Sequence, residues 1–175
     1  ARGGNLFFWD ATDALTTRGV LLSSESGASN VPTKVNTLLV SDNRFVFCFG
    51  TNALGGSDLD PMQLRWSDQE NALNWTPSST NQAGDLRLSK GSEIITAIQG
   101  RQEILVWTDS ALYALQYVGA PAVWGSQTVG ENLSIASTRA VAYANGVAYW
   151  MGTDKFYKYD GRTETLKCDL RRYVF

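Results

Sequence analysis

Two short turn motifs constrain the fold of this chain more than any other feature, and they are Asn145-Gly146 and Asp160-Gly161. Both signal a β-hairpin, because a type I′ turn needs positive φ at its two central residues, which Asn, Asp and Gly tolerate. They separate runs of four or five residues that are rich in Tyr, Phe, Val and Thr within 138–166. This spacing predicts a four-stranded antiparallel meander, the unit from which β-propellers are built.

A similar pattern occurs earlier in the chain and indicates an internal repeat. The predicted second strands each open on an Asn or Gln ahead of an apolar run, and they begin at Asn43, Gln102 and Asn145. The predicted third strands begin at Asn5, Gln63, Ala111 and Lys155. No amphipathic pattern with a period of about 3.6 residues extends over a useful length, so we expect little helix.

The repeat predicts an all-β chain of β-propeller blades, each a four-stranded antiparallel meander. The predicted division is a partial blade (its last two strands) with a linker over 1–32, a blade with long loops over 33–91, further blades over 92–137 and 138–166, and the start of another strand over 167–175. A propeller needs roughly four to eight blades to close. We therefore expect a partial propeller, a segment of a larger chain. A closed ring of four blades, completed by a strand from Tyr173 onward, stays open as the alternative.

Composition narrows the class of protein. The sequence is 43% hydrophobic and 18% charged, which is typical of a globular domain. Its net charge is −2 and its basic residues are scattered, with one basic pair at Arg171-Arg172, so an extended nucleic-acid-binding patch is not expected. No apolar run approaches the roughly 18 residues of a membrane span, and no signal peptide pattern is visible.

The residues that carry chemistry form no recognisable active-site pattern. Histidine is absent, which removes the commonest general base and metal ligand. A glycosidase would need two carboxylates that face each other across a cleft, and none of the 17 acidic residues is singled out for that role. Asp58 and Asp60 could hint at calcium, but the later ligands of a calcium loop are missing, which favours a solvated loop. We expect no catalytic residue, no cofactor and no metal.

Several residues instead indicate turns and core. Asp68 and Trp75 lie in a stretch that resembles the Asp-box turn of sialidase-like propellers, where a carboxylate accepts backbone N–H groups and a Trp packs between sheets. Asn145-Gly146 and Asp160-Gly161 are predicted turns. Cys48 lies in an apolar run, where a buried free thiol is the ordinary interpretation. A single bridge to Cys168 is the alternative.

Large aromatic residues recur at matching places in the predicted strands. Trp107 and Trp150 match late in the second strands, and Trp66 matches Tyr159 late in the third strands. Sheets of a propeller pack face to face, so such aromatics are predicted to fill the space between neighbouring sheets. Stacking of Trp107, Trp124 and Trp150 on sugars is the alternative.

Five motifs in order carry a resemblance to a known family, and they lie at 62–77, 106–113, 117–121, 130–132 and 146–161. Together they resemble the β-propeller region of tail proteins from tailed bacteriophages. The closest group is the nozzle, or tail tubular protein B-like, proteins and related packaged-DNA stabilisation proteins of short-tailed phages.

The resemblance covers most of 36–175 and implies a structural virion component rather than an enzyme. Members of that family form homohexameric rings below the portal and adaptor, and genome DNA leaves through the channel without sequence-specific binding. Assembly would take place in the host cytoplasm. Family members are several hundred residues long, so the chain is expected to be part of such a protein. The residues themselves leave a carbohydrate-binding or glycan-hydrolysing β-propeller as the alternative.

Overall fold

The computed structural model describes residues 2–175. Fourteen strands dominate this part of the chain, with one turn of 3-10 helix and one short α-helix. The strands form three four-stranded sheets and one two-stranded ribbon, all antiparallel, so the predicted all-β class of four-stranded meanders is confirmed. The chain divides into two compact units at Leu88 and Ser89.

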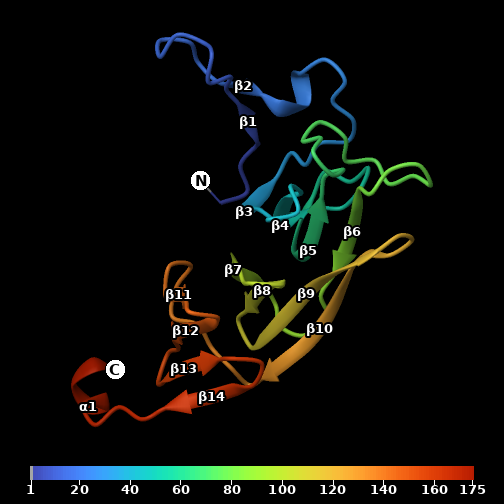
Figure 1. Cartoon of the computed structure of the whole chain (residues 1–175). Helices are drawn as coiled ribbons and strands as arrows, with labels where there is room; N and C mark the ends of the chain where they lie inside the picture. Colours follow the sequence, from blue (N-terminus) through green and yellow to red (C-terminus); the bar gives the residue numbers. More distant parts are fainter. Residues whose placement is uncertain (1) are drawn as a thin grey trace. The chain divides into compact units, whose positions relative to one another are not determined.

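The first unit holds a short ribbon and one meander (Figure 1). The ribbon consists of β1 (Phe7–Phe8) and β2 (Val20–Leu21), and the 3-10 turn Leu22–Ser24 follows it. The meander consists of β3 (Val35–Val40), β4 (Val46–Asn52), β5 (Leu59–Trp66) and β6 (Gly84–Arg87), which pair in chain order. One face of this meander contributes to a core cluster that contains Leu22, Val31, Val35, Cys48 and Trp75.

The second unit holds two further meanders, coloured from yellow-green to red in Figure 1. The first consists of β7 (Ile94–Gln99), β8 (Glu103–Thr108), β9 (Ala111–Gly119) and β10 (Val123–Glu131). The second consists of β11 (Val141–Ala144), β12 (Val147–Met151), β13 (Phe156–Tyr159) and β14 (Thr163–Leu166). In both sheets each strand pairs with its neighbours in sequence.

One face of each of these two sheets contributes to a shared core. The members from β8 and β9 are Leu105, Trp107, Leu112 and Ala114, and those from β12 and β13 are Ala148, Trp150, Tyr157 and Tyr159. Within each strand they are two residues apart, because successive side chains point to opposite faces of a sheet. The sheets therefore pack face to face, and we call the layer of side chains between them the aromatic seam.

The two predicted turns differ. Asn145 and Gly146 have φ values of 52° and 83°, as the type I′ prediction requires. At the second turn only Gly161 has positive φ, and Tyr159 pairs with Thr163, so three residues connect the strands. The type I′ prediction for Asp160-Gly161 is wrong, because a three-residue connection needs a left-handed conformation only at its glycine.

The fourth strand of the first meander follows a long loop. This loop begins after Trp66 and contains Trp75, and β6 begins at Gly84. Gly84 lies under the ring of Trp66, and a Cβ at this position would be 2.4 Å from a ring carbon. The glycine allows the backbone of β6 to lie close to the Trp66 ring. Because this short strand has no clear alternation of polar and apolar residues, the sequence pattern did not reveal it.

The last residues form a helical turn instead of a strand. Residues Arg171–Val174 are α1, held by a hydrogen bond from Tyr173 N–H to the Leu170 carbonyl (2.8 Å). Phe175 packs edge-on against Phe156, with ring centroids 5.2 Å apart. The predicted strand at the end of 167–175 is wrong, because local helical hydrogen bonds and this contact outweigh the β-propensity of the aromatic residues. The alternative of a closed four-bladed ring needed a strand from Tyr173 onward, and the structure has a helical turn there instead.

Candidate functional site

The stretch that resembles an Asp box is a structural turn between β5 and β6. The Asp68 carboxylate oxygen Oδ1 accepts the backbone N–H groups of Gln69 (3.0 Å) and Gln82 (2.8 Å). Trp75 is buried, and its indole N–H donates to the carbonyl of Ala72 (2.7 Å). These contacts fix the loop between two strands, and both side chains use their polar atoms within the fold.

Trp66 lies on a different face from the one predicted. It pairs with Phe47, whereas Cys48, the next residue, faces the cluster around Trp75. In the third meander, Tyr159 shares its face with Trp150. Since Cys48 matches Trp150 in the repeat, Trp66 and Tyr159 fall on opposite faces of their sheets. The predicted match is wrong by one residue of register, which is enough to reverse the face of a strand residue.

Arg65 is a buried cation that the sequence patterns did not reveal. Its guanidinium group donates to the carbonyls of Asn30 (2.6 Å), Trp75 (3.3 Å) and Asn52 (3.5 Å). Burial lowers the pKa of Arg65, and the charge of Asp85 opposes this shift. Because Arg65 donates to backbone carbonyls of two loop residues, Asn30 and Trp75, and of Asn52 at the end of β4, it holds these loops to the sheet.

Both Trp residues of the aromatic seam are buried. The rings of Trp107 and Trp150 contact edge to face, and Trp150 stacks on Tyr157 with ring centroids 5.2 Å apart. Trp124, on the outer strand β10, is also buried and contacts Tyr117 edge-on. A sugar-stacking platform needs an exposed ring face, and none of Trp107, Trp124 and Trp150 offers one.

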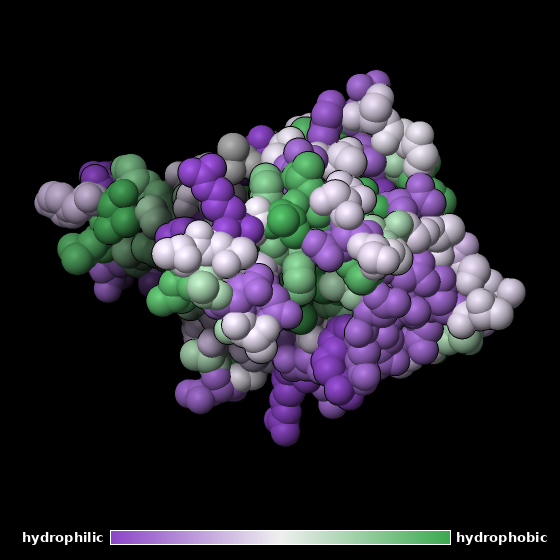
Figure 2. Space-filling view, turned by 90° about the horizontal axis from the view of Figure 1, so that it is seen from above, coloured by the Kyte–Doolittle hydropathy of each residue, from purple (hydrophilic) through white to green (hydrophobic). Residues whose placement is uncertain are grey.

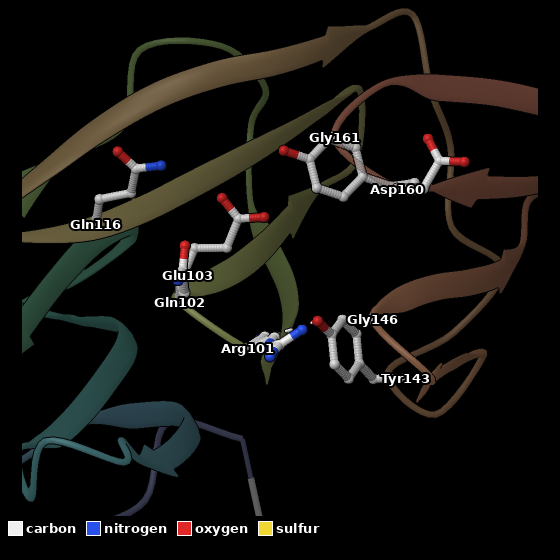
Figure 3. Close-up of a pocket in the computed structure, with 9 residues that line it drawn as sticks. Arg101, Gln102, Glu103, Gln116, Tyr143, Gly146, Asp160 and Gly161 are labelled. Carbon is white, nitrogen blue, oxygen red and sulfur yellow. Dashed lines mark hydrogen bonds between the residues drawn. The ribbon is translucent and has the colours of Figure 1, made fainter.

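A pocket of about 460 Å³ opens where the turns of the two sheets of the second unit meet (Figure 3). We call it the seam pocket. The side chains that carry its chemistry are Arg101, Glu103, Gln116, Tyr143, Tyr159 and Asp160. Gly146 and Gly161, predicted only as turn residues, also line it.

Strand alternation explains why these side chains converge. Glu103 and Gln116 are directly paired across β8 and β9, so they point to the same side of their sheet. On the facing sheet Tyr143, Ala148 and Tyr159 form one cross-strand row. The small side chain of Ala148 lies between the two tyrosines and leaves space between them. In Figure 3, Glu103 and Gln116 lie on one side of the pocket, and Tyr143 lies on the other.

A hydrogen bond fixes one wall of the seam pocket. The hydroxyl of Tyr143 accepts the backbone N–H of Arg101 (2.9 Å), which ties the β7–β8 turn to β11. In the same cross-strand row as Tyr143, burial together with the nearby charge of Glu103 raises the pKa of Tyr159 to about 12. Tyr159 therefore stays neutral at physiological pH, and its hydroxyl remains able to donate a hydrogen bond.

The charges around the pocket are nearly balanced. Lys158 pairs with the carboxylates of Asp160 (3.1 Å) and Glu164 (3.1 Å), and its hydrogen bond to Asp160 lowers the pKa of Asp160. In Figure 3 the Asp160 carboxylate is turned away from Glu103. The cation of Arg101 and the anion of Glu103 then remain as opposite charges, which suits hydrogen bonding to a neutral polar molecule.

The sequence patterns pointed to the turns around this pocket but not to the pocket itself. Its polar residues are scattered from Arg101 to Asp160, and only the pairing of two meanders brings them together. Within residues 2–175 no three or more Cys, Asp and Glu side chains converge as a metal site would require. No helix in the same range is long and apolar enough to cross a membrane. Protein-family models and curated proteins give no match to the sequence.

Proposed function

We propose that the chain is a structural component of a bacteriophage tail. It would be part of a nozzle or tail tube protein whose β-propeller forms part of the channel that retains and delivers the genome. The motifs over 62–77 and 146–161 resemble that group of proteins. The face-to-face packing of two meanders through buried aromatic rings supports a rigid building unit.

The single observation that carries this proposal is the pair of aromatic side chains left accessible on the open face of the sheet β11–β14. The face opposite the aromatic seam presents Tyr149, which is 42% exposed, and the half-buried Phe156. The matching residues of the other sheet, Val106 and Ala111, are 0% and 1% exposed. Lys158 and Glu164, which form an ion pair, share this face with the aromatic residues. Exposed aromatic side chains next to polar ones are typical of a surface that a partner covers. Figure 2 shows further hydrophobic patches among polar residues on the face in view.

The proposed partners follow from this role. We propose a homohexameric ring in the virion, in contact with other tail proteins such as the adaptor and assembled in the host cytoplasm. Genome DNA would pass through the channel without sequence-specific binding. A net charge of −2 supports this, because an acidic protein does not retain a polyanion by charge attraction.

The experiment is to purify the complete protein that contains this chain and to measure its mass in solution by light scattering and its shape by electron microscopy. We expect six-fold rings. Tyr149→Glu places a charge on the open face beside Lys158 and is expected to reduce ring formation without lowering the melting temperature. Gln127→Glu, an exposed change on β10, is the matched control and should leave the rings intact.

Particles that remain monomeric at micromolar concentration would contradict the proposed assembly. Turnover of a glycoside by the same preparation would instead favour a glycan-hydrolysing propeller. That alternative requires two carboxylates across a cleft. In the seam pocket, Asp160 is already paired with Lys158. Measuring ring formation and glycoside turnover in the same preparation distinguishes the structural function from the enzymatic one.

A further inference from the structure

The seam pocket contains polar side chains that the fold does not use. The guanidinium group of Arg101 and the side-chain amide of Gln116 have no hydrogen-bond partner among the described residues. Both are exposed. Gln116 lies beside Glu103 on the neighbouring strand, so its amide and the carboxylate point to the same side of the sheet. Donors and an acceptor are therefore gathered at one place without a structural task.

The other polar side chains of the pocket keep hydrogen-bonding capacity for a ligand. The Tyr143 oxygen accepts a hydrogen bond from Arg101 N–H, and its own O–H remains able to donate. The carboxylate of Glu103 lines the pocket, and a carboxylate has two oxygens and about four acceptor positions. Because the contact with Arg101 also holds the Tyr143 ring in place, a ligand would lose little energy to ordering that ring.

The shape of the pocket adds an apolar surface and an open rim. The half-buried ring of Tyr143 provides a flat apolar wall next to polar groups. At the rim, a Cβ on Gly146 would meet no atom within 4 Å, so the turn backbone is open to approach. Its volume of about 460 Å³ suits a small molecule, because ligand pockets commonly measure about 300–1,000 Å³.

We propose that the seam pocket binds one unit of a neutral saccharide. Each sugar hydroxyl both donates and accepts, which matches the mixture of Arg101, Gln116 and Glu103. The C–H face of a pyranose ring matches the flat ring of Tyr143. The near balance of charge favours a neutral sugar over a strongly acidic one. The proposal concerns binding alone and goes beyond the structural role, which does not require it.

The test uses the complete protein and an array of neutral mono- and oligosaccharides, followed by calorimetry with the sugar that binds. We expect millimolar to micromolar affinity. Gln116→Ala and Arg101→Ala should each weaken binding by about five- to tenfold, because each removes a hydrogen bond to the ligand. Gln127→Ala, on the same sheet but outside the pocket lining, should leave affinity unchanged. Melting temperatures of all three variants should equal that of the parent, since these side chains are exposed.

Three results would overturn the proposal. One is no binding of any neutral saccharide at millimolar concentration by a folded protein. Another is binding that Gln116→Ala and Arg101→Ala both leave unchanged. The third is binding of acidic sugars alone, which would make Arg101 an anion site. Ring formation by Gln116→Ala, measured in the same preparation, separates a failure of this site from a failure of the proposed assembly.

Discussion

The indole rings of Trp107 and Trp150 meet edge to face, with centroids 5.4 Å apart and ring planes at 67°. They come from β8 and β12, which are the second strands of successive meanders. The repeat that is visible in the sequence thus becomes a physical contact, in which one copy of the repeated residue packs against the next.

Trp150→Ala is expected to destabilise the second unit strongly. The side chain is 2% exposed and contacts both Trp107 and Tyr157, so its removal would leave a cavity at a cost of about 3–5 kcal/mol. Chemical denaturation followed by circular dichroism measures the change. Tyr149→Ala, the adjacent exposed position, is the control and should cost much less. Equal unfolding midpoints for Trp150→Ala and the parent would contradict a core role.

The two tryptophans should respond differently to replacement by phenylalanine. The Trp150 indole N–H donates to the carbonyl of Ser134 (3.2 Å), whereas the buried N–H of Trp107 has no hydrogen-bond partner among the described residues. Both changes remove similar volume, but only Trp150→Phe loses a hydrogen bond. We expect it to be more destabilising than Trp107→Phe by about 1 kcal/mol. Urea unfolding of the pair tests this, and the reverse order would exclude the explanation.

Arg65→Met should destabilise the first unit by about 2–3 kcal/mol. The change leaves the carbonyls of Asn30, Trp75 and Asn52 without this donor, although removal of a buried charge offsets part of the loss. Arg87→Met is the matched control, since Arg87 is exposed and its ion pair with Asp60 should contribute less than about 1 kcal/mol. Urea unfolding measures the free energy of unfolding of both variants. Similar decreases in the two would show that the hydrogen bonds of Arg65 stabilise the protein no more than an exposed ion pair does.

Replacement of the first residue of each turn by alanine should destabilise the protein to different degrees at the two turns. Asn145→Ala forces Ala into a φ of 52°, which costs about 1–2 kcal/mol. Asp160→Ala needs no positive φ and loses only a solvent-exposed contact with Lys158, so it should destabilise the protein less than Asn145→Ala does. Thermal melts of both variants provide the comparison. An equal loss would indicate that the three-residue description of the second turn is incorrect.

Cys48 should remain unreactive in the folded protein. It is free and fully buried, and burial raises the pKa of its thiol. The half-buried Cys168 should react with a thiol reagent faster, and Cys48 only after unfolding. The pKa of the Cys48 thiol is higher in the folded state than in the unfolded state. The contribution of Cys48 to the free energy of unfolding is therefore full below about pH 8.5 and falls as the pH rises above that value. Cys48→Ser should remove this dependence, as urea unfolding across this pH range would show.

The parts of the fold that could be predicted are those that local sequence determines. Asn145-Gly146 fixes a turn by its backbone preference alone, and strand alternation around Trp150 fixes which side chains face the core. Both signals lie within a few residues of the position they describe.

The parts that were missed depend on long-range contacts. Arg65 is recognisable only once Asn30 and Trp75 bring their carbonyls to it, and β6 is specified by the approach of Gly84 to Trp66. The seam pocket is a third case, since its lining comes from two sheets whose facing is set by buried side chains. Its residues are ordinary polar residues of strand ends and turns, and no spacing in the sequence distinguishes them.

The strict chain order of the strands in all three meanders also has a kinetic consequence. Every strand of a sheet finds its partner across one short connection or one longer loop, so hairpins can close early, and chains with local contacts fold quickly. During synthesis each meander can be complete before the next one leaves the ribosome. The contact between Trp107 and Trp150 must then form late, as two finished sheets dock.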